Sequence, residues 1–135
     1  MLDIEPHVIE VQAERDIVTA RSTARQVAVS LGFGAIDQSR IATAVSELTR
    51  NIVRYATDGR GQVTVRGTQD RLGIEVIVSD EGPGIADLDL VMQDGYTSGG
   101  GMGLGLPGTK RLMDEMQIES QPGRGTTITI RKWRR

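Results

Sequence analysis

Glu47 and Asn51 place a carboxylate and an amide one helical turn apart. They are four residues apart in the sequence, so on a helix their side chains lie one above the other on one face. Arg54 follows on the same stripe. A carboxylate can serve as a general base, and an amide oxygen can be one of the few protein ligands of Mg²⁺. On these residues alone, a solvated polar helix face is the simpler interpretation.

Asp80 ends a run in which apolar residues alternate along the chain. It shares the parity of Val76 and Val78, which predicts that its side chain points toward the core. Because a buried carboxylate without a partner is costly, a hydrogen-bond donor such as the exocyclic amine of adenine would explain its position. Gly82 and Gly84 follow, and glycine lets a flat ring approach the backbone closely. A simple turn after a strand is the alternative.

A glycine-rich segment, SGGGMGLGL, gives the strongest local pattern of the sequence. Its exposed backbone amides would lead into a helix, and both amides and a helix N-terminus attract anions. The pattern predicts a cradle for phosphate groups. A flexible linker is the alternative, but linkers do not normally carry apolar residues between their glycines. The predicted cradle comprises Gly99, Gly100, Gly101, Met102, Gly103, Leu104, Gly105 and Leu106.

Other nucleotide-binding and catalytic motifs do not fit. Gly103, Gly105 and Gly108 match GxGxxG, but a dinucleotide fingerprint directly follows an apolar strand, and a long polar loop precedes these glycines. The sequence contains no Walker A motif, no HRD and no DFG. It has no cysteine, which excludes thiolate metal sites. Its one histidine, His7, is expected to be a surface or strand residue.

The periodicity of the apolar residues predicts the elements that hold these motifs. A strand is expected at 4–11, followed by a helix capped by Asp16 and stopped by Gly32, and by a second helix capped by Asp37. Residues 63–65 and 72–78 predict a hairpin, 108–116 predict a third helix, and 118–130 predict a closing hairpin that turns at Pro122 and Gly123. The inward stripe of the second helix is Ile41, Ala44, Val45, Leu48, Ile52 and Tyr55.

Two helices, then grouped strands with one inserted helix, predict an α+β layer sandwich. The chain of 135 residues is expected to form one domain, 1–135. A net charge of -2 and 3% aromatic residues argue against nucleic-acid binding. The basic cluster at 131–135 is expected to be a solvated tail. No apolar run reaches the ~20 residues of a membrane span, and no signal pattern is found, so a cytoplasmic protein is expected.

Taken in order, the three motifs resemble the N, G1 and G2 boxes of the GHKL ATPases. Within that superfamily, the chain is most similar to the serine/threonine kinases of bacterial stressosomes, over the stretches SELTRNIVRYA, SDEGPGI, GLGLPGTKRLMDE and GRGTTITIRKW. The anti-sigma-factor kinases are the next most similar. The resemblance covers nearly the whole chain and implies a two-layer sandwich of the Bergerat type, with a mixed, mostly antiparallel sheet covered by helices on one face.

The resemblance also implies a role for each motif residue. Glu47 would be the general base, Asn51 would bind Mg²⁺, and Asp80 would hydrogen-bond adenine with support from Thr126. The γ-phosphate would meet backbone amides of the cradle, Mg²⁺ and one of Arg50, Arg54 and Lys110. The other residues expected to contact ATP are Gly82 and Gly84 beneath the adenine, Ile85, and the residues of the cradle, of which Gly101, Gly103 and Gly105 would lie against the phosphates.

The family further implies ATP and Mg²⁺ as cofactors and a role in partner switching. Such kinases phosphorylate STAS-domain scaffold or antagonist proteins and, when released, activate a PP2C-type phosphatase. No nucleic-acid or membrane partner is expected. The alternative is an anti-sigma factor or another binding switch in which the nucleotide is mainly structural.

Overall fold

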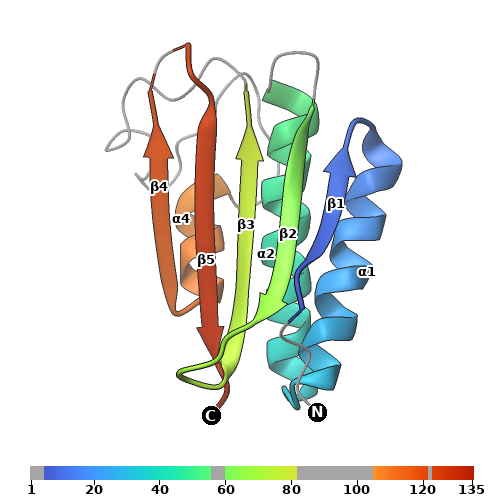
Figure 1. The fold of residues 1–135 in the computed structure, drawn as a ribbon, viewed down its shortest axis with the longest axis vertical. Coiled ribbons are helices and arrows are strands. Elements are labelled where there is room, and N and C mark those ends of the chain that lie inside the picture. The colour runs from blue at the N-terminus through green and yellow to red at the C-terminus, as the bar shows by residue number, and fades with distance from the viewer. Residues whose placement is uncertain (1–4, 56–59, 82–104, 122) are drawn as a thin grey trace.

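The structure is a computed structural model that describes residues 5–55, 60–81, 105–121 and 123–135. In this part of the chain, helices cover one face of a five-stranded sheet and leave the other face bare (Figure 1). The strand order is β1-β2-β3-β5-β4, and neighbouring strands pair antiparallel. The predicted α+β sandwich is confirmed.

The elements are β1 (His7–Val11), α1 (Glu14–Ser30), α2 (Ala35–Tyr55), β2 (Gly61–Gly67), β3 (Gly73–Asp80), α4 (Gly105–Leu112), β4 (Glu115–Ser120) and β5 (Thr126–Trp133).

The core lies between α2 and the sheet. The predicted inward stripe of α2 is buried from Ile41 to Ile52, and the side chain of Tyr55 lies outside the described part. The pairing of both predicted hairpins is confirmed, with Val63 opposite Val78 and Ile118 opposite Ile128. Pro122, in the predicted turn of the second hairpin, lies outside the described residues. The side chains of β2, β3 and β5 that belong to the same buried core are Val63, Val65, Ile74, Val76, Val78, Ile128 and Ile130.

Both predicted N-caps are wrong by a few residues. Helix α1 has Ala13 as its N-cap, and the carboxylate of Asp16 accepts the backbone N–H groups of Gln12 at 2.8 Å and Ala13 at 3.0 Å. Asp16 thus satisfies free donors from inside the first turn. These backbone hydrogen bonds, that of Gln12 first, lower the pKa of Asp16. Asp37 likewise lies within the first turn of α2.

Strand β1 and helix α4 also differ from their predicted bounds. Strand β1 begins at His7 rather than Ile4, since Pro6 has no N–H to donate to a ladder. Helix α4 was expected at 108–116 but begins at Gly105 and ends at Leu112. Met116 belongs to β4, where it pairs with Ile130.

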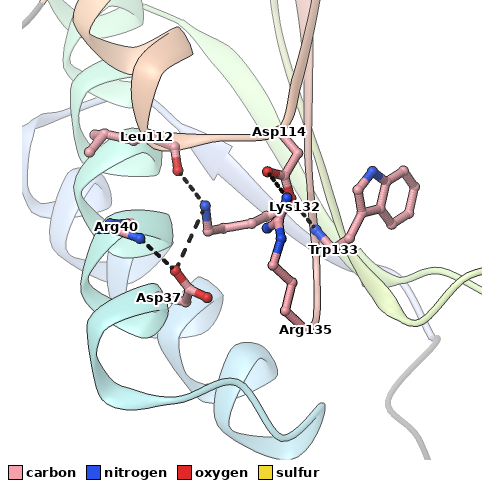
Figure 2. Close-up of polar contacts among 7 residues, drawn as sticks. All are labelled: Asp37, Arg40, Leu112, Asp114, Lys132, Trp133 and Arg135. Carbon is pink, nitrogen blue, oxygen red and sulfur yellow. Dashed lines mark hydrogen bonds and ion pairs between the residues drawn. The ribbon is translucent and has the colours of Figure 1, made fainter.

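The basic C-terminal cluster is part of the fold, so the expectation of a solvated tail is wrong. Lys132 is buried and reaches the helix layer, whereas the Trp133 ring points to the other side (Figure 2). Arg131 pairs with Glu75 at 2.7 Å, and Arg135 pairs with Asp114 at 2.9 Å. Strand alternation explains the buried lysine, because Lys132 shares the inward parity of Ile128 and Ile130.

Among the described residues, the helices are too short or too polar to cross a bilayer.

Candidate functional site

The predicted polar stripe of α2 lies beside its buried stripe. The Glu47 side chain is 14% exposed, and its Oε1 lies 2.9 Å from Nη1 of Arg50. Asn51 is half-buried, and Arg54 is exposed. Glu47 and Asn51 therefore stand at the rim of the helix layer, where a ligand can reach them without entering the core.

The end of β3 lies beneath the last turns of α2. Asp80 is the last residue of β3 and pairs with Gly61 of β2. A Cβ atom on Gly61 would lie 2.9 Å from Cγ2 of Ile52, and Ile52 directly follows Asn51 in α2. This close approach, which needs a glycine at 61, joins the strand end that carries Asp80 to the turn of α2 that carries Asn51.

Thr126 lies opposite Asp80 at the start of β5. It is only 9% exposed, and its Oγ1 lies 2.8 Å from Oγ of Ser120. Ser120 also donates a hydrogen bond to the carbonyl oxygen of Gly125 at 3.1 Å. The three residues Asp80, Thr126 and Ser120 form a polar row across β3, β5 and β4.

Sequence reasoning missed Ser120, Gly125 and Gly61. The position of Ser120 opposite Thr126 depends on the hairpin register, which the alternating pattern does not fix to one residue. Gly125 has a φ of 83°, and a Cβ atom there would clash with the carbonyl oxygen of Asp80. The segment GRGTT offered a pattern for Gly125, since a glycine beside a strand start often marks close backbone approach.

Helix α4 presents its N-terminus to the same end of the sheet. Figure 1 shows the start of α4, the end of α2, the end of β3 and the start of β5 directed to one end of the molecule, the upper end in that view. Gly105 opens the helix, and its carbonyl oxygen accepts a hydrogen bond from Oγ1 of Thr109 at 2.8 Å. The side chain of Leu106 is buried in the core, so only its backbone can face a ligand.

The remaining predicted site residues lie outside the described part of the chain. They are Gly82, Gly84, Ile85, Gly99, Gly100, Gly101, Met102, Gly103 and Leu104.

The donor set suits a nucleotide with a hard cation. Mg²⁺ takes oxygen ligands and is usually held by one or two protein side chains together with substrate phosphates. Asn51 offers an amide oxygen at the rim of α2, and the first turn of α4 carries N–H groups on Gly105, Leu106 and Gly108 that have no acceptor within the helix and suit phosphate. Within the described ranges, no group of three or more His, Cys, Asp or Glu residues forms a separate metal site.

Comparison with known proteins supports an ATPase fold. The family described as "Histidine kinase-, DNA gyrase B-, and HSP90-like ATPase" matches residues 36–135. The chain is 50% identical over 129 residues to the serine/threonine-protein kinase RsbT of Bacillus subtilis (strain 168), covering 94% of this chain and 96% of the relative. It is 33% identical over 120 residues to the anti-sigma F factor of Caldanaerobacter subterraneus subsp. tengcongensis, covering 84% and 82%.

Two solved structures share the fold. The RsbU and RsbW domains of Rv1364c from Mycobacterium tuberculosis match with a TM-score of 0.69 at 22% identity, over 96% of this chain and 32% of that one. The mycobacterial sensor histidine kinase MprB matches with a TM-score of 0.59 at 25% identity, over 98% of both chains. Membership of the matched family implies ATP binding. The chain belongs to the histidine kinase-, DNA gyrase B- and HSP90-like ATPase family, as an RsbT-like serine/threonine protein kinase.

Proposed function

We propose that this kinase transfers the γ-phosphoryl group of Mg-ATP to a serine or threonine of a STAS-domain scaffold or antagonist protein. It would act in the cytoplasm, within a stressosome partner-switching module, and would activate a PP2C-type phosphatase when it is released. The observation that carries the proposal is the position of Glu47 at the rim of α2, one turn from Asn51. The identity to RsbT over 94% of the chain supports it.

The adenine would lie at the end of β3. The carboxylate of Asp80 would accept a hydrogen bond from the exocyclic amine, while Thr126 and Ser120 would form the polar wall beside it. The hydroxyl contact of 2.8 Å between Thr126 and Ser120 gives this wall a fixed geometry. Such a row suits adenine because a carboxylate accepts the hydrogen bonds that the exocyclic amine donates.

The phosphates would lie between α2 and the start of α4. The backbone donors at Gly105 and Leu106 would bind phosphate oxygens, since a helix N-terminus attracts anions. Asn51 would hold Mg²⁺, which neutralises charge on the phosphates. Arg50 or Arg54 could add a positive charge from α2, and Lys110 could add one from α4.

Glu47 would accept the proton of the attacking hydroxyl. As the substrate oxygen bonds to the γ-phosphorus, the bond from that phosphorus to the bridging oxygen of ADP breaks, and the hydroxyl proton passes to the Glu47 carboxylate. The ion pair with Arg50 at 2.9 Å holds this carboxylate in one orientation. A base held in place loses less freedom in the transition state.

Glu47→Gln tests the assignment of the base. We expect phosphorylation of a STAS-domain protein to slow by about 10² or more, the usual contribution of general-base catalysis. Affinity for Mg-ATP should be retained, because the amide keeps the size of the side chain. The measurements are phosphosite mapping and the single-turnover rate of phosphotransfer, each with wild type and Glu47→Gln. An unchanged rate in Glu47→Gln would show that another group takes the proton.

The alternative is a binding module that sequesters a sigma factor. It is favoured by the 33% identity to an anti-sigma F factor over 84% of this chain. One experiment distinguishes the kinase from the binding module. In it, the chain is purified from a cell lysate with and without ATP, together with any protein that it retains. Phosphorylation of the retained protein supports the kinase, whereas a retained sigma factor without phosphotransfer supports the binding module.

A further inference from the structure

Lys132 is a buried cation that connects two helices. It lies on the helix-covered face of β5, and its side chain is only 6% exposed. Its Nζ donates a hydrogen bond to the carbonyl oxygen of Leu112 at 2.8 Å and lies 3.8 Å from Oδ1 of Asp37 (Figure 2). An ammonium group is rarely this buried unless its partners compensate for lost water.

Both partners of Lys132 stand at helix ends where charge is favourable. Leu112 is the last residue of α4, and the final carbonyls of a helix carry partial negative charge that a cation stabilises. Asp37 lies in the first turn of α2, where an anion is favoured. The same Asp37 oxygen also contacts Nη1 of Arg40 at 3.2 Å. Lys132 thus joins the end of α4 to the start of α2 through the sheet.

Helix α4 depends on such contacts for its position. It has eight residues, and helices this short are not stable alone in water. The junction after it is also fixed, because Asp114 accepts the backbone N–H of Trp133 at 2.8 Å. A rigid helix of this length spans about 12 Å, so a shift at Leu112 is transmitted to Gly105 at the site.

We propose that Lys132 is a positioning residue for the phosphate end of the ATP site. By holding the last carbonyl of α4, it fixes where the first N–H groups of that helix meet the phosphates. The inference rests on the proposed function, in which those groups bind ATP. The adenine end is independent of this contact, because Asp80 and Thr126 are held by the pairing of β3 with β5.

Because Lys132 contacts α4, which serves the phosphate end of the site and not the adenine end, a positioning role can be distinguished from general support of the fold. If Lys132 merely stabilises the core, its loss weakens every ligand equally or none at all. If it positions α4, its loss weakens ligands that carry phosphates and spares adenosine, which reaches only the sheet end of the site.

The experiment compares Lys132→Met with wild type by calorimetric titration of Mg-ATP and of adenosine. Methionine keeps most of the length of the side chain but cannot bond the Leu112 carbonyl. We expect a loss of about tenfold in Mg-ATP affinity, the usual effect of one hydrogen bond to a charged group, with adenosine affinity unchanged. Hydrogen exchange should be faster at the amides of α4 and unchanged in α1.

Arg134→Met is the matched control, because it removes an exposed cation of the same segment that lies against Gly32 rather than against α4. It should bind both ligands as wild type does. Equal affinity of wild type and Lys132→Met for Mg-ATP, or an equal loss for both ligands, overturns the positioning role. Absence of Mg-ATP binding by wild type would instead overturn the proposed function.

If Lys132→Met does not fold, Asp37→Asn decides the question. It weakens the hold on Nζ from the α2 side while leaving the Leu112 contact in place. A smaller loss confined to Mg-ATP supports the proposal, and affinities equal to those of wild type for both ligands contradict it.

Discussion

Gly125 stands where the turn between β4 and β5 meets the end of β3. Its φ is 83°, and the position of a Cβ atom is occupied by the backbone of Asp80 and Glu81. Gly123 in the same turn has a φ of 77°, but among the described residues no atom beyond its chain neighbours lies within 4 Å of its Cβ position. The two glycines therefore share a backbone requirement and differ in the space around them.

We expect Gly125→Ala to reduce both stability and Mg-ATP affinity. A non-glycine residue at positive φ costs about 1–2 kcal/mol, and the clash adds to that cost by displacing the strand end that carries Asp80. The measurements are urea unfolding and Mg-ATP titration. Gly123→Ala is the control, because it should lose only the backbone part of the stability and no affinity. Equal effects of the two substitutions would contradict the role given to the Asp80 contact.

At this scale, the sequence predicts chemistry better than it predicts neighbours. Glu47 and Asn51 could be found because their spacing alone places them on one helix face. Lys132 was wrongly assigned to a solvated tail because a cluster of charges suggested solvent. Its partners, Leu112 and Asp37, are 20 and 95 residues away, and no local pattern reveals them.

A row of charges crosses the bare face of the sheet. Glu75 of β3 lies opposite Arg66 of β2 and Arg131 of β5. Its Oε1 lies 2.8 Å from Nη2 of Arg66, and its Oε2 lies 2.7 Å from Nε of Arg131. Arg131 also contacts Glu115 of β4 at 3.4 Å. The row links four strands on the face opposite the helices.

This row should make stability depend on pH. Burial raises the pKa of Glu75, but hydrogen bonds and charge from Arg131 and Arg66 outweigh burial, so its pKa is lowered. The folded state therefore binds the proton less readily than the unfolded state, whose glutamate pKa is about 4.3. The resulting stability is present above that value and is lost as pH falls through the lowered pKa.

Glu75→Gln tests this dependence. The variant should be less stable at pH 7 by about 1–3 kcal/mol, since two arginines lose a charged acceptor. It should also lose less stability than wild type between about pH 5 and pH 3, the range around the pKa of an unfolded glutamate. Urea unfolding across this range measures both effects. Glu115→Gln, at the exposed end of the row, should change little, and parallel pH profiles for wild type and Glu75→Gln would refute the assignment.

Elements were predictable in kind, while their ends were not. Period-two alternation was enough for both hairpins, and the stripe from Ile41 to Ile52 was enough for α2. The caps were misplaced because a carboxylate in the first turn serves nearly as well as one at the N-cap. At the end of α4, Lys132 bonds the Leu112 carbonyl oxygen, and Asp114 accepts the N–H of Trp133 in β5, so this end is set by tertiary contacts.

At the scale of the whole molecule, the site is built at one end of a single layer of helices on a sheet. The proposed site takes Asp80 and Thr126 from the sheet, Glu47 and Asn51 from α2, and the N-terminus of α4, and these element ends are directed to one end of the molecule (Figure 1). The fold class could be predicted because the order of elements restricts the arrangements in which each apolar face is covered. The close approach of α2 to this end of the sheet could not, since it depends on the space at Gly61 that Ile52 fills.

Together these parts are proposed to bind one Mg-ATP, with its adenine at Asp80. The most direct test is calorimetric titration of Mg-ATP into wild type, Asp80→Asn and the control Asp70→Asn, whose aspartate is exposed in the turn before β3. We predict that wild type and Asp70→Asn bind alike, while Asp80→Asn binds at least about tenfold more weakly, as expected when a hydrogen-bond acceptor loses its charge. No binding by wild type, or equal binding by Asp80→Asn, would contradict the account.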